Sequence, residues 1–456
     1  MAQHSVEVIV VGAGVAGLVT AMRLRESGYH VAVLEGRDRV GGRTVDREIP
    51  NSGGQAIEMG GQWIGPTQHR ALGLIAELGL ELYPTYDSGE HIADFNGRLR
   101  RYEGRIPWLG ACTLINIGLA QLKLDRAAKK VVTDAPWKSR NAGMYDRQTF
   151  ADWIARNVKT KSGREFFRIV TETVFCAEPE DMSALWAIFY LGSAGGLDAL
   201  ITTREGAQHA RVVGGAQLIS IRLAERLGDA VTLNAAVAAI DWSGERVVVT
   251  TRDGRRFTAG RVVLTVPPAL AGSIAMTPPM PPARNALIAS MPMGSVLKVN
   301  VIYETPFWRE TGLSGQANSD VRALSSVYDN TPHTGSPAVL LGLLEGKHAK
   351  ATAAMSADTR RQLVFDDLAG YFGPKAYDAV DYLEMDWCAE EFSGGCYGGF
   401  AQPEMLTRYG TALREPVGPI HFAGTETATR WAGYIDGAAE SGEKVAAELK
   451  AILNAA

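Results

Sequence analysis

The chain has few cysteines: four among 456 residues, spread between positions 112 and 396. So sparse a set excludes a disulfide framework, and without CxxC spacing it does not suit a zinc site. Cys112, Cys176 and Cys388 are therefore interpreted as small core residues. The eight histidines form no HExxH pattern, so no metal site is expected. Cys396 stands apart because it lies between glycines in FSGGCYGG, residues 392–399.

Long apolar runs and an excess of one charge are also missing. No run approaches the roughly 20 residues of a membrane helix, and the N-terminus lacks the basic segment of a signal peptide. The formal net charge is -4 and the basic residues are scattered, which excludes the basic stripe of a nucleic-acid-binding protein. An amphipathic helix is expected over residues 439–453, with no hydrophobic tail after it. These features predict a cytoplasmic protein with no membrane anchor and no nucleic-acid partner, acting on a small molecule.

A strand–helix–strand unit is expected at the N-terminus. Residues 7–11 (EVIVV) form a short buried strand, and residues 18–28 carry apolar side chains at helical spacing up to a terminal glycine. Residues 29–35 form a second apolar strand that ends on an acid. This arrangement is the βαβ unit of nucleotide-binding folds.

The turn inside this unit carries a dinucleotide fingerprint. Gly12, Gly14 and Gly17 allow a tight turn and a close approach of the backbone to a pyrophosphate at the helix N-terminus. Glu35 follows Gly17 by 18 residues, near the spacing of about 20 expected for an acid that holds ribose hydroxyls. A second glycine–arginine stretch comes next and favours a longer phosphate contact than simple NAD dehydrogenases have; it contains Arg37, Gly41, Gly42 and Arg43.

Two later segments are expected to join the same sheet. One contains a strand in which Val237 could lie against an adenine, followed by a hairpin through Asp253 and Gly254; the other covers residues 418–449. Segments so far apart can share a sheet only if other modules are inserted between them. The predicted nucleotide-binding domain therefore comprises residues 1–82, 213–286 and 388–456, and a second domain comprises residues 83–212 and 287–387. The proline-rich residues 276–285 are interpreted as a linker.

Six motifs together resemble the flavin-containing monoamine oxidases: VVGAGVAGL, VLEGRDRVGGRT, EMGGQWIGPTQ, GSVLKVNVIYETPFWR, WCAEEFSGGCYGGF and FAGTETATRWAGYIDGAAESGE. The resemblance implies a mixed α/β and α+β fold, in which a Rossmann-like FAD-binding domain carries an inserted substrate-binding domain. It implies FAD as cofactor, a small-molecule amine as substrate and O2 as acceptor, with imine or aldehyde, ammonia and H2O2 as products. A homodimer is compatible with it, although the sequence does not reveal the oligomeric state. The membrane anchor of the mitochondrial members has no counterpart here.

The resemblance also implies roles for particular residues. Cys396 matches the cysteine that forms a thioether to the flavin 8α-methyl, although a buried inert cysteine remains the alternative because some relatives bind FAD without a covalent bond. Tyr397 and Tyr434 match two tyrosines that flank the substrate amine, and Lys298 matches a lysine bonded through water to flavin N5. The helix that begins near Tyr434 is expected to aim its positive end at the reduced flavin. The remaining cofactor contacts implied are Gly60, Trp387, Thr425, Glu426 and Ile435.

The sequence match is loosest in the inserted domain, which is expected to form the walls of the substrate pocket. The resemblance places Phe175 and Cys176 near the pocket, Leu200 and Ile201 at a gate, and Gln208 as a substrate-orienting residue. Ser326 replaces a bulky aromatic residue, which suggests a wider pocket. No acid is evident for a second ammonium, so a primary monoamine is favoured over a diamine. A secondary or cyclic amine of the nicotine type, an L-amino acid, and a flavin dehydrogenase with another acceptor remain alternatives.

Overall fold

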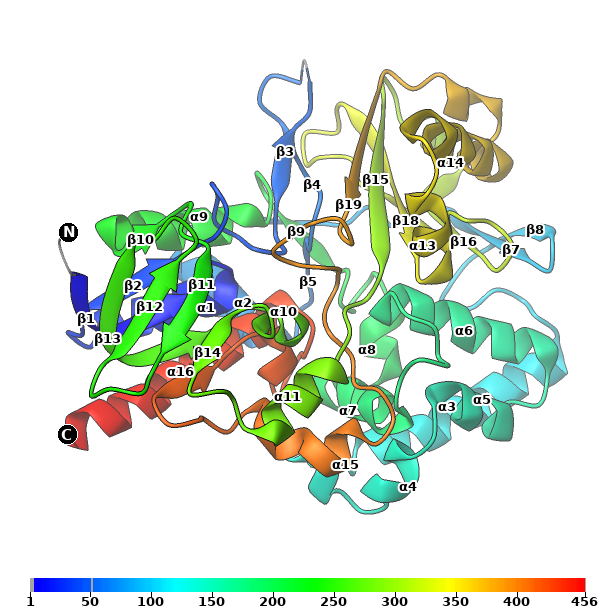
Figure 1. The fold of residues 1–456 in the computed structure, drawn as a ribbon. Helices are drawn as coiled ribbons and strands as arrows, with labels where there is room; N and C mark the ends of the chain where they lie inside the picture. Colours follow the sequence, from blue (N-terminus) through cyan, green and yellow to red (C-terminus); the bar gives the residue numbers. More distant parts are fainter. Residues whose placement is uncertain (1–3, 51, 456) are drawn as a thin grey trace.

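The computed structural model describes residues 4–50 and 52–455. Within these residues, two large β-sheets lie at the left and upper right of Figure 1, and a group of helices lies at the lower right. The larger sheet is formed by three parts of the chain that lie far apart in the sequence. It has the strand order β10-β2-β1-β13-β12-β11-β14, and β20 pairs with β13. Its strands are β1 (His4–Val11), β2 (Val31–Leu34), β10 (Val231–Thr232), β11 (Val237–Asp241), β12 (Val247–Thr251), β13 (Arg256–Leu264), β14 (Ala275–Thr277) and β20 (Ile420–Phe422).

The predicted βαβ unit forms the centre of this sheet. β1 pairs in parallel with β2 and β13, and its residues Val8, Ile9 and Val10 are fully buried, as an apolar run covered on both faces should be. Helix α1 (Val15–Arg25) starts directly after Gly14, which is its N-cap. The carboxyl ends of β1 and β2 and the N-terminus of α1 therefore meet at one edge.

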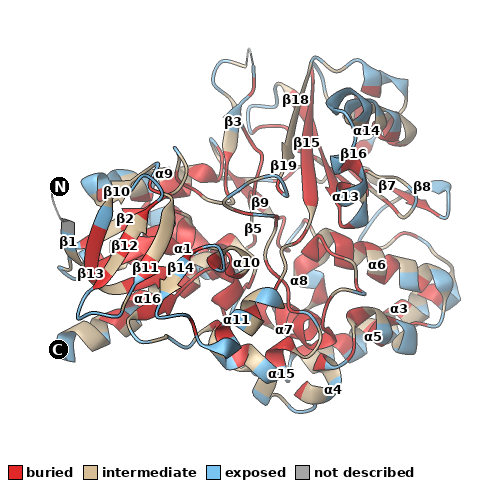
Figure 2. Cartoon of the chain, in the orientation of Figure 1, coloured by how far each residue is buried: buried red, intermediate tan, exposed pale blue. Residues whose placement is uncertain are grey.

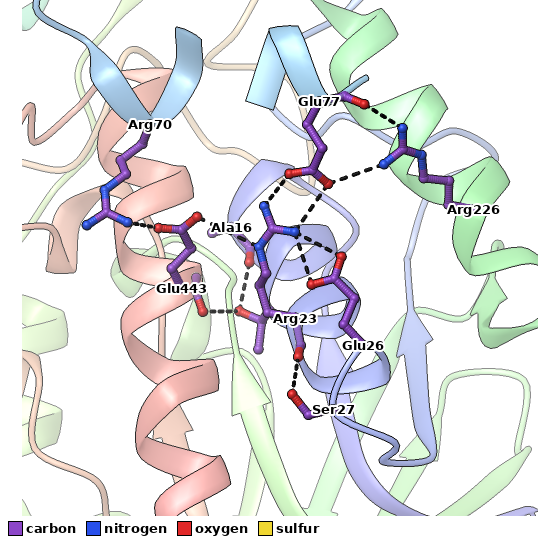
Figure 3. Close-up of polar contacts among 10 residues, drawn as sticks. Ala16, Arg23, Glu26, Ser27, Arg70, Glu77, Arg226 and Glu443 are labelled. Atoms are coloured by element: carbon purple, nitrogen blue, oxygen red, sulfur yellow. Dashed lines mark hydrogen bonds and ion pairs between the residues drawn. The ribbon is translucent and has the colours of Figure 1, made fainter. Parts of the chain in front are cut away.

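One face of the sheet is covered by α1, α2 (His69–Glu77), α9 (Gln217–Leu227) and α16 (Ile435–Ala455), which share one apolar core with it. An ion-pair cluster joins these helices at their exposed sides (Figure 3). Arg23 of α1 pairs with Glu77 of α2 at 2.6 Å, and Arg226 of α9 pairs with the same carboxylate at 3.2 Å. Arg70 of α2 pairs with Glu443 of α16. The helices are thus joined to one another beside the C-terminal end of α1.

The second sheet has the order β19-β15-β18-β17-β16-β7-β8. All eight residues of β15 and of β18 are buried, as the red ribbons of Figure 2 show. Alternate residues of β15, such as Leu297 and Val299, pack with α14 (Ala357–Phe372), so Val296 and Lys298 face the other way. Its strands are β7 (Glu90–Phe95), β8 (Arg98–Tyr102), β15 (Val296–Tyr303), β16 (Leu313–Ser319), β17 (Ser326–Asp329), β18 (Ala338–Glu345) and β19 (Asp381–Asp386).

The helices at the lower right of Figure 1 surround a third core, to which α3, α5, α6, α7 and α15 contribute. The remaining helices are α3 (Ala111–Ala128), α4 (Ala142–Asp146), α5 (Phe150–Asn157), α6 (Lys161–Phe175), α7 (Ala184–Ala194), α8 (Leu197–Ile201), α10 (Pro268–Ala271), α11 (Pro282–Ala289), α12 (Phe307–Glu310), α13 (Lys347–Ala353) and α15 (Met405–Tyr409). Short strands complete the fold: β3 (Asp46–Glu48), β4 (Ala56–Glu58), β5 (Trp63–Ile64), β6 (Leu82–Pro84) and β9 (Ala210–Val212).

Two expectations from the sequence are wrong. The proline-rich residues 276–285 are not a linker, because β14 pairs with β11 and α11 begins at Pro282 with proline in its first turn, where no backbone N–H is needed. Cys112 and Cys388 are exposed and not core residues, since both lie at positions where the chain faces solvent. Among the helices of the described residues, none is both long and apolar enough to span a bilayer.

Candidate active site

A large cavity runs from the carboxyl ends of β1 and β2 to the inner face of the second sheet. Val11 and Leu34 line one end, and Leu343 and Tyr328 line the other. Side chains from the first sheet, the second sheet and the helical group all contribute to its walls. The site is therefore assembled from residues far apart in the sequence.

The glycines of the fingerprint leave space that a side chain would fill. A Cβ at Gly17 would lie 2.1 Å from the carbonyl oxygen of Gly12, so only glycine lets α1 pack this closely on the turn. Gly14 and Gly42 line the cavity and face each other, with 3.9 Å between a Cβ at Gly14 and the Cα of Gly42. Backbone is thus exposed to the cavity at the N-terminus of α1, as a phosphate site requires.

Glu35 and Arg37 line the next part of the wall. The Glu35 carboxylate accepts the backbone N–H of Ala13 at 2.7 Å and that of Arg37 at 3.0 Å, which fixes its position while leaving acceptor capacity on both oxygens. The Nε of Arg37 is buried without a hydrogen-bond partner among the described residues. A buried unpaired donor beside a cavity suits a ligand with acceptor oxygens.

Arg43 links this part of the cavity to the segment around Cys396. Its guanidinium donates to the carbonyl of Tyr397 at 2.9 Å and to the carboxylate of Glu426 at 2.5 Å. Burial would raise the pKa of Glu426, but Arg43 holds that pKa below its usual range. Glu426 does not line the large cavity, whereas Gly60, Trp387, Thr425 and Ile435 do. Glu426 thus holds Arg43 in position.

Cys396 lies at the cavity wall because glycine precedes it. A Cβ at Gly395 would lie 2.3 Å from the carbonyl oxygen of Gly294, and the N–H of Cys396 donates to that oxygen at 3.0 Å. Burial raises the pKa of the Cys396 thiol to about 12, although Arg43 and Lys298 act in the opposite direction. The thiol is therefore protonated at neutral pH in the protein alone.

Tyr397 and Tyr434 both line the cavity. Tyr434 packs against Tyr190, with 6.0 Å between ring centroids, and edge-on against Trp431 at 5.0 Å. The hydroxyl of Tyr397 donates to Glu345 at 3.3 Å. Burial raises the pKa of both tyrosines, so both hydroxyls stay protonated.

Lys298 reaches the cavity from the middle of β15 and is buried, unlike the solvated lysine expected of an edge strand. Its Nζ donates to the carbonyl of Gly60 at 2.8 Å and to the side-chain oxygen of Gln62. Burial lowers the pKa of Lys298 to about 7, which the nearby carboxylate of Glu58 partly offsets. A lysine poised in this way can hold or release a proton near neutral pH.

The residues expected at the substrate end divide into two groups. Leu200 and Gln208 line the cavity, and Gln208 donates to the carbonyl of Leu200 at 3.0 Å while its own oxygen has no partner among the described residues. Four others are not part of the wall of the large cavity: Phe175, Cys176, Ile201 and Ser326. Phe175 packs against Tyr190, with 4.6 Å between ring centroids and 56° between ring planes, and supports that part of the wall from behind.

Several lining residues were not found from the sequence. They include Gln62, Thr173, Tyr190, Tyr328 and Leu343. Gln62 lies in the motif EMGGQWIGPTQ but was not singled out there, and the other four lie outside the motifs and reach the cavity through long-range packing. Glu345 is an acid that the sequence analysis did not place near the pocket. It ends the otherwise apolar strand β18, directly after AVLLGLL, and a charged residue at that position was a usable signal.

The glycine-rich backbone at Gly12, Gly14 and Gly42, called the cofactor cradle below, opens onto a cavity lined by aromatic side chains. This combination is typical of a flavin-dependent oxidoreductase. The family described as flavin containing amine oxidoreductase matches residues 15–450. A Mycobacterium tuberculosis (strain ATCC 25618 / H37Rv) protein assigned the name flavin-containing monoamine oxidase AofH is 41% identical, covering 98% of this chain and 97% of its own. Amine oxidase [flavin-containing] B of Cavia porcellus is 38% identical, covering 98% of this chain and 86% of its own.

Solved structures agree with this result. Putrescine oxidase bound to putrescine has a TM-score of 0.95 and 35% identity, covering 99% of this chain and 100% of its own. Cyclohexylamine oxidase from Brevibacterium oxydans IH-35A has a TM-score of 0.92 and 32% identity, covering 98% and 99%. The chain belongs to the flavin containing amine oxidoreductase family and is an FAD-dependent amine oxidase, with the fold expected from its motifs. FAD fits the residues present: the glycines at the N-terminus of α1 expose backbone to the cavity, and the Nε of Arg37 is a donor without a partner among the described residues.

Proposed function

We propose that this amine oxidase acts on a primary monoamine and uses O2 as the final electron acceptor. The products are an imine, which hydrolyses to aldehyde and ammonia, and H2O2. When bound, FAD supplies the acceptor for the hydride that leaves the substrate carbon. The observation that carries the proposal is the presence of Tyr397, Tyr434 and Lys298 on the wall of the same cavity as the glycine cradle. One solved neighbour is named for a primary monoamine, cyclohexylamine.

Tyr397 and Tyr434 are the residues we assign to the substrate amine. Their rings are half-buried in an aromatic part of the cavity that Tyr190 and Tyr328 also line, so contact with bulk water is reduced there. Removal from water disfavours an ammonium ion relative to the neutral amine, and only the neutral amine has the lone pair that assists loss of hydride. The negative faces of the rings orient the nitrogen.

Lys298 is the residue we assign to the second half of the reaction. Its contacts with Gly60 and Gln62 hold Nζ at one point of the cavity wall. Because burial lowers its pKa to about 7, Lys298 exchanges a proton readily, as the reduction of O2 to H2O2 requires. The N-terminus of α16 also lies at the cavity, since Ile435 and Ala438 line it, and it supplies positive potential there.

Cys396 is the residue we assign to covalent attachment of FAD through a thioether. In support, its side chain lines the cavity, and Gly395 lets the backbone pack closely behind it. Solved variants described as a redesign of cofactor binding in putrescine oxidase include one that introduces a cysteine in place of an alanine. Since burial keeps the thiol protonated, the bond is expected to form only after FAD has bound.

We also propose the domain division stated above, with residues 1–82, 213–286 and 388–456 forming the FAD-binding part. The larger sheet supports this division, because β1, β2 and β10 to β14 fall within the first two ranges and β20 falls within the third.

Anaerobic mixing of the oxidised enzyme with benzylamine, tyramine, cyclohexylamine, putrescine and free L-amino acids tests the proposed substrate. We expect monoamines to bleach the flavin fastest and air to restore the colour with release of H2O2. Faster bleaching by L-amino acids would instead establish an amino acid oxidase. Bleaching by monoamines without reoxidation by air would show that another acceptor is used.

A further inference from the structure

Glu345, the last residue of β18, is a buried carboxyl with an unusual set of partners. It is 0% exposed. One oxygen accepts from Ser325 at 2.9 Å and from Ser326 at 3.3 Å, and the hydroxyl of Thr173 lies 3.4 Å from the same oxygen. The other oxygen accepts from Tyr397 at 3.3 Å. Four hydroxyls thus converge on this carboxyl, and no basic side chain bonds to it among the described residues.

Two of these four hydroxyl groups belong to the wall of the substrate cavity. Thr173 and Tyr397 both line it, while Glu345 itself does not. Glu345 shares its face of β18 with Leu343, which also lines the cavity. The carboxyl therefore lies one side chain behind the inner wall, in an otherwise largely apolar region.

The charged groups around Glu345 leave its charge uncompensated. On β15, Lys298 bonds to Gly60 and Gln62 and not to Glu345. On α13, Lys347 pairs with Glu172 of α6 and with Glu178. The other titratable groups that interact with Glu345 are Cys176, Tyr328 and Tyr397, and all three are neutral at pH 7, because burial raises their pKa. Burial likewise raises the pKa of Glu345 to about 7, against the effect of its four hydrogen bonds.

We propose that Glu345 is a specificity-determining residue. It positions Tyr397 and Thr173 through their hydroxyls, and its negative charge behind the inner cavity wall favours binding of amines as cations. This inference rests on the proposed function and names the feature of the substrate that the cavity selects. An amine enters as an ammonium ion, and a carboxylate behind the wall attracts it before it loses its proton between the tyrosine rings. A unit charge roughly 10 Å away, at an effective dielectric constant of about 20, changes affinity on the order of ten-fold.

Glu345→Gln, which keeps size and polarity but removes the charge, tests the inference. We expect the ratio of KM for benzylamine in the variant to KM in the wild type to rise from about 1 at pH 5.5 to about 10 at pH 8.5, because only the wild type gains a charge over that range. The rate of flavin reduction at saturating amine should change much less than KM. A ratio that is independent of pH would overturn the inference.

Asp367→Asn is the matched control. Asp367 is also a buried carboxyl whose pKa is raised by burial, but it bonds to Leu324 and Arg322 on the far side of the second sheet. Its KM ratio should stay near 1 at both pH values. A pH-dependent ratio in this variant as well would overturn the inference, since the effect would then not be specific to Glu345.

Two further measurements do not depend on amine oxidation. Burial raises the pKa of Asp46 and of Glu172 to about 8, so these carboxyls also give an infrared carbonyl band when protonated. In the FAD-loaded wild type, a separate component of this band should titrate near pH 7, be lost in Glu345→Gln and persist in Asp367→Asn. Ser325→Ala removes a hydrogen bond to the carboxylate without touching the cavity wall, so it should shift the midpoint of this band upward. An unchanged band in Glu345→Gln or an unmoved midpoint in Ser325→Ala refutes the titrating charge. If no amine bleaches the flavin in any variant but the band behaves as expected, it is the proposed function that fails.

Discussion

A methyl group added at Gly17 has no room in the cofactor cradle. The Cβ of an alanine would lie 2.1 Å from the carbonyl oxygen of Gly12 and 2.9 Å from the hydroxyl of Thr265, whereas real Cβ contacts are essentially never below 3.0 Å. The Gly12 carbonyl must therefore retreat by about 1 Å, and it belongs to the backbone that shapes the turn. Overpacking costs about 1–3 kcal/mol, and a clash with backbone places Gly17→Ala near 3 kcal/mol of unfolding free energy.

The same displacement distorts the turn against which FAD must bind. We expect the FAD affinity of Gly17→Ala to fall at least ten-fold, and the purified variant to carry less flavin per chain than the wild type. Urea unfolding of the FAD-loaded protein, followed by tryptophan fluorescence, measures the stability. Flavin absorbance relative to protein absorbance measures the cofactor content.

Gly118→Ala is the matched control, because Gly118 also lies inside a helix, α3, but a Cβ there meets nothing within 4 Å. This variant should be more stable than the wild type by about 0.5–1 kcal/mol, the helix propensity gained over glycine. The reasoning is refuted if Gly17→Ala matches Gly118→Ala in stability and flavin content.

Four further predictions concern the active site and the helices that support it. Lys298→Met should slow reoxidation of the flavin by air far more than its reduction by amine, and stopped-flow absorbance separates the two steps. Burial lowers the pKa of Lys298 to about 7, so the unfolded wild type keeps this proton to higher pH than the folded wild type does. Between pH 7 and pH 9 the free energy of unfolding of the wild type should therefore rise by roughly 2 kcal/mol relative to that of Lys298→Met. Tyr434→Leu should lower kcat/KM for amines, and unchanged kinetics would refute the assigned tyrosine pair. Acid precipitation should leave yellow flavin in the wild-type pellet and release it from Cys396→Ala; a colourless wild-type pellet would refute the thioether. Glu77→Gln should lower the free energy of unfolding by less than 1 kcal/mol at neutral pH, because the ion pair with Arg23 is partly exposed. Arg23 lowers the pKa of Glu77, so this difference in unfolding free energy should disappear as the pH falls below about 4 and Glu77 becomes protonated.

The cofactor cradle was readable from the sequence because its geometry is local. The turn at Gly12, the start of α1 and the acid at Glu35 depend on steric constraints and hydrogen bonds among neighbouring residues of one βαβ unit. Such constraints leave a glycine pattern that any chain with this turn must carry. The same holds for Gly395, whose lack of a side chain lets Cys396 lie against Gly294.

The environment of Lys298 could not be read in the same way. Alternation with apolar neighbours is compatible with a solvated edge strand, and only the pairing of β15 with both β18 and β19 makes it a central strand. That pairing brings together residues 296–303, 338–345 and 381–386. It explains why the side chain is buried and why its pKa is lowered to about 7.

The residues at the substrate end show where inference from motifs stops. Phe175, Cys176 and Ser326 were expected at the pocket, yet they lie behind its wall, while Thr173, Tyr328 and Leu343 form that wall. Which of two neighbouring residues on a helix or strand faces a cavity depends on how that element is rotated by its packing. A change of one or two positions moves a side chain from the wall to the layer behind it.

The amino-acid sequence by itself determined that this chain binds a dinucleotide, that its class is a flavin-dependent amine oxidase, and which glycines must remain glycine, because these features follow from short-range backbone geometry and from contiguous motifs. The tertiary structure alone decided that Lys298 is buried, that Glu426 holds Arg43, and that Glu345 lies behind Tyr397 and Thr173. Those properties arise from desolvation and from contacts between segments more than fifty residues apart, which leave no local pattern in the chain.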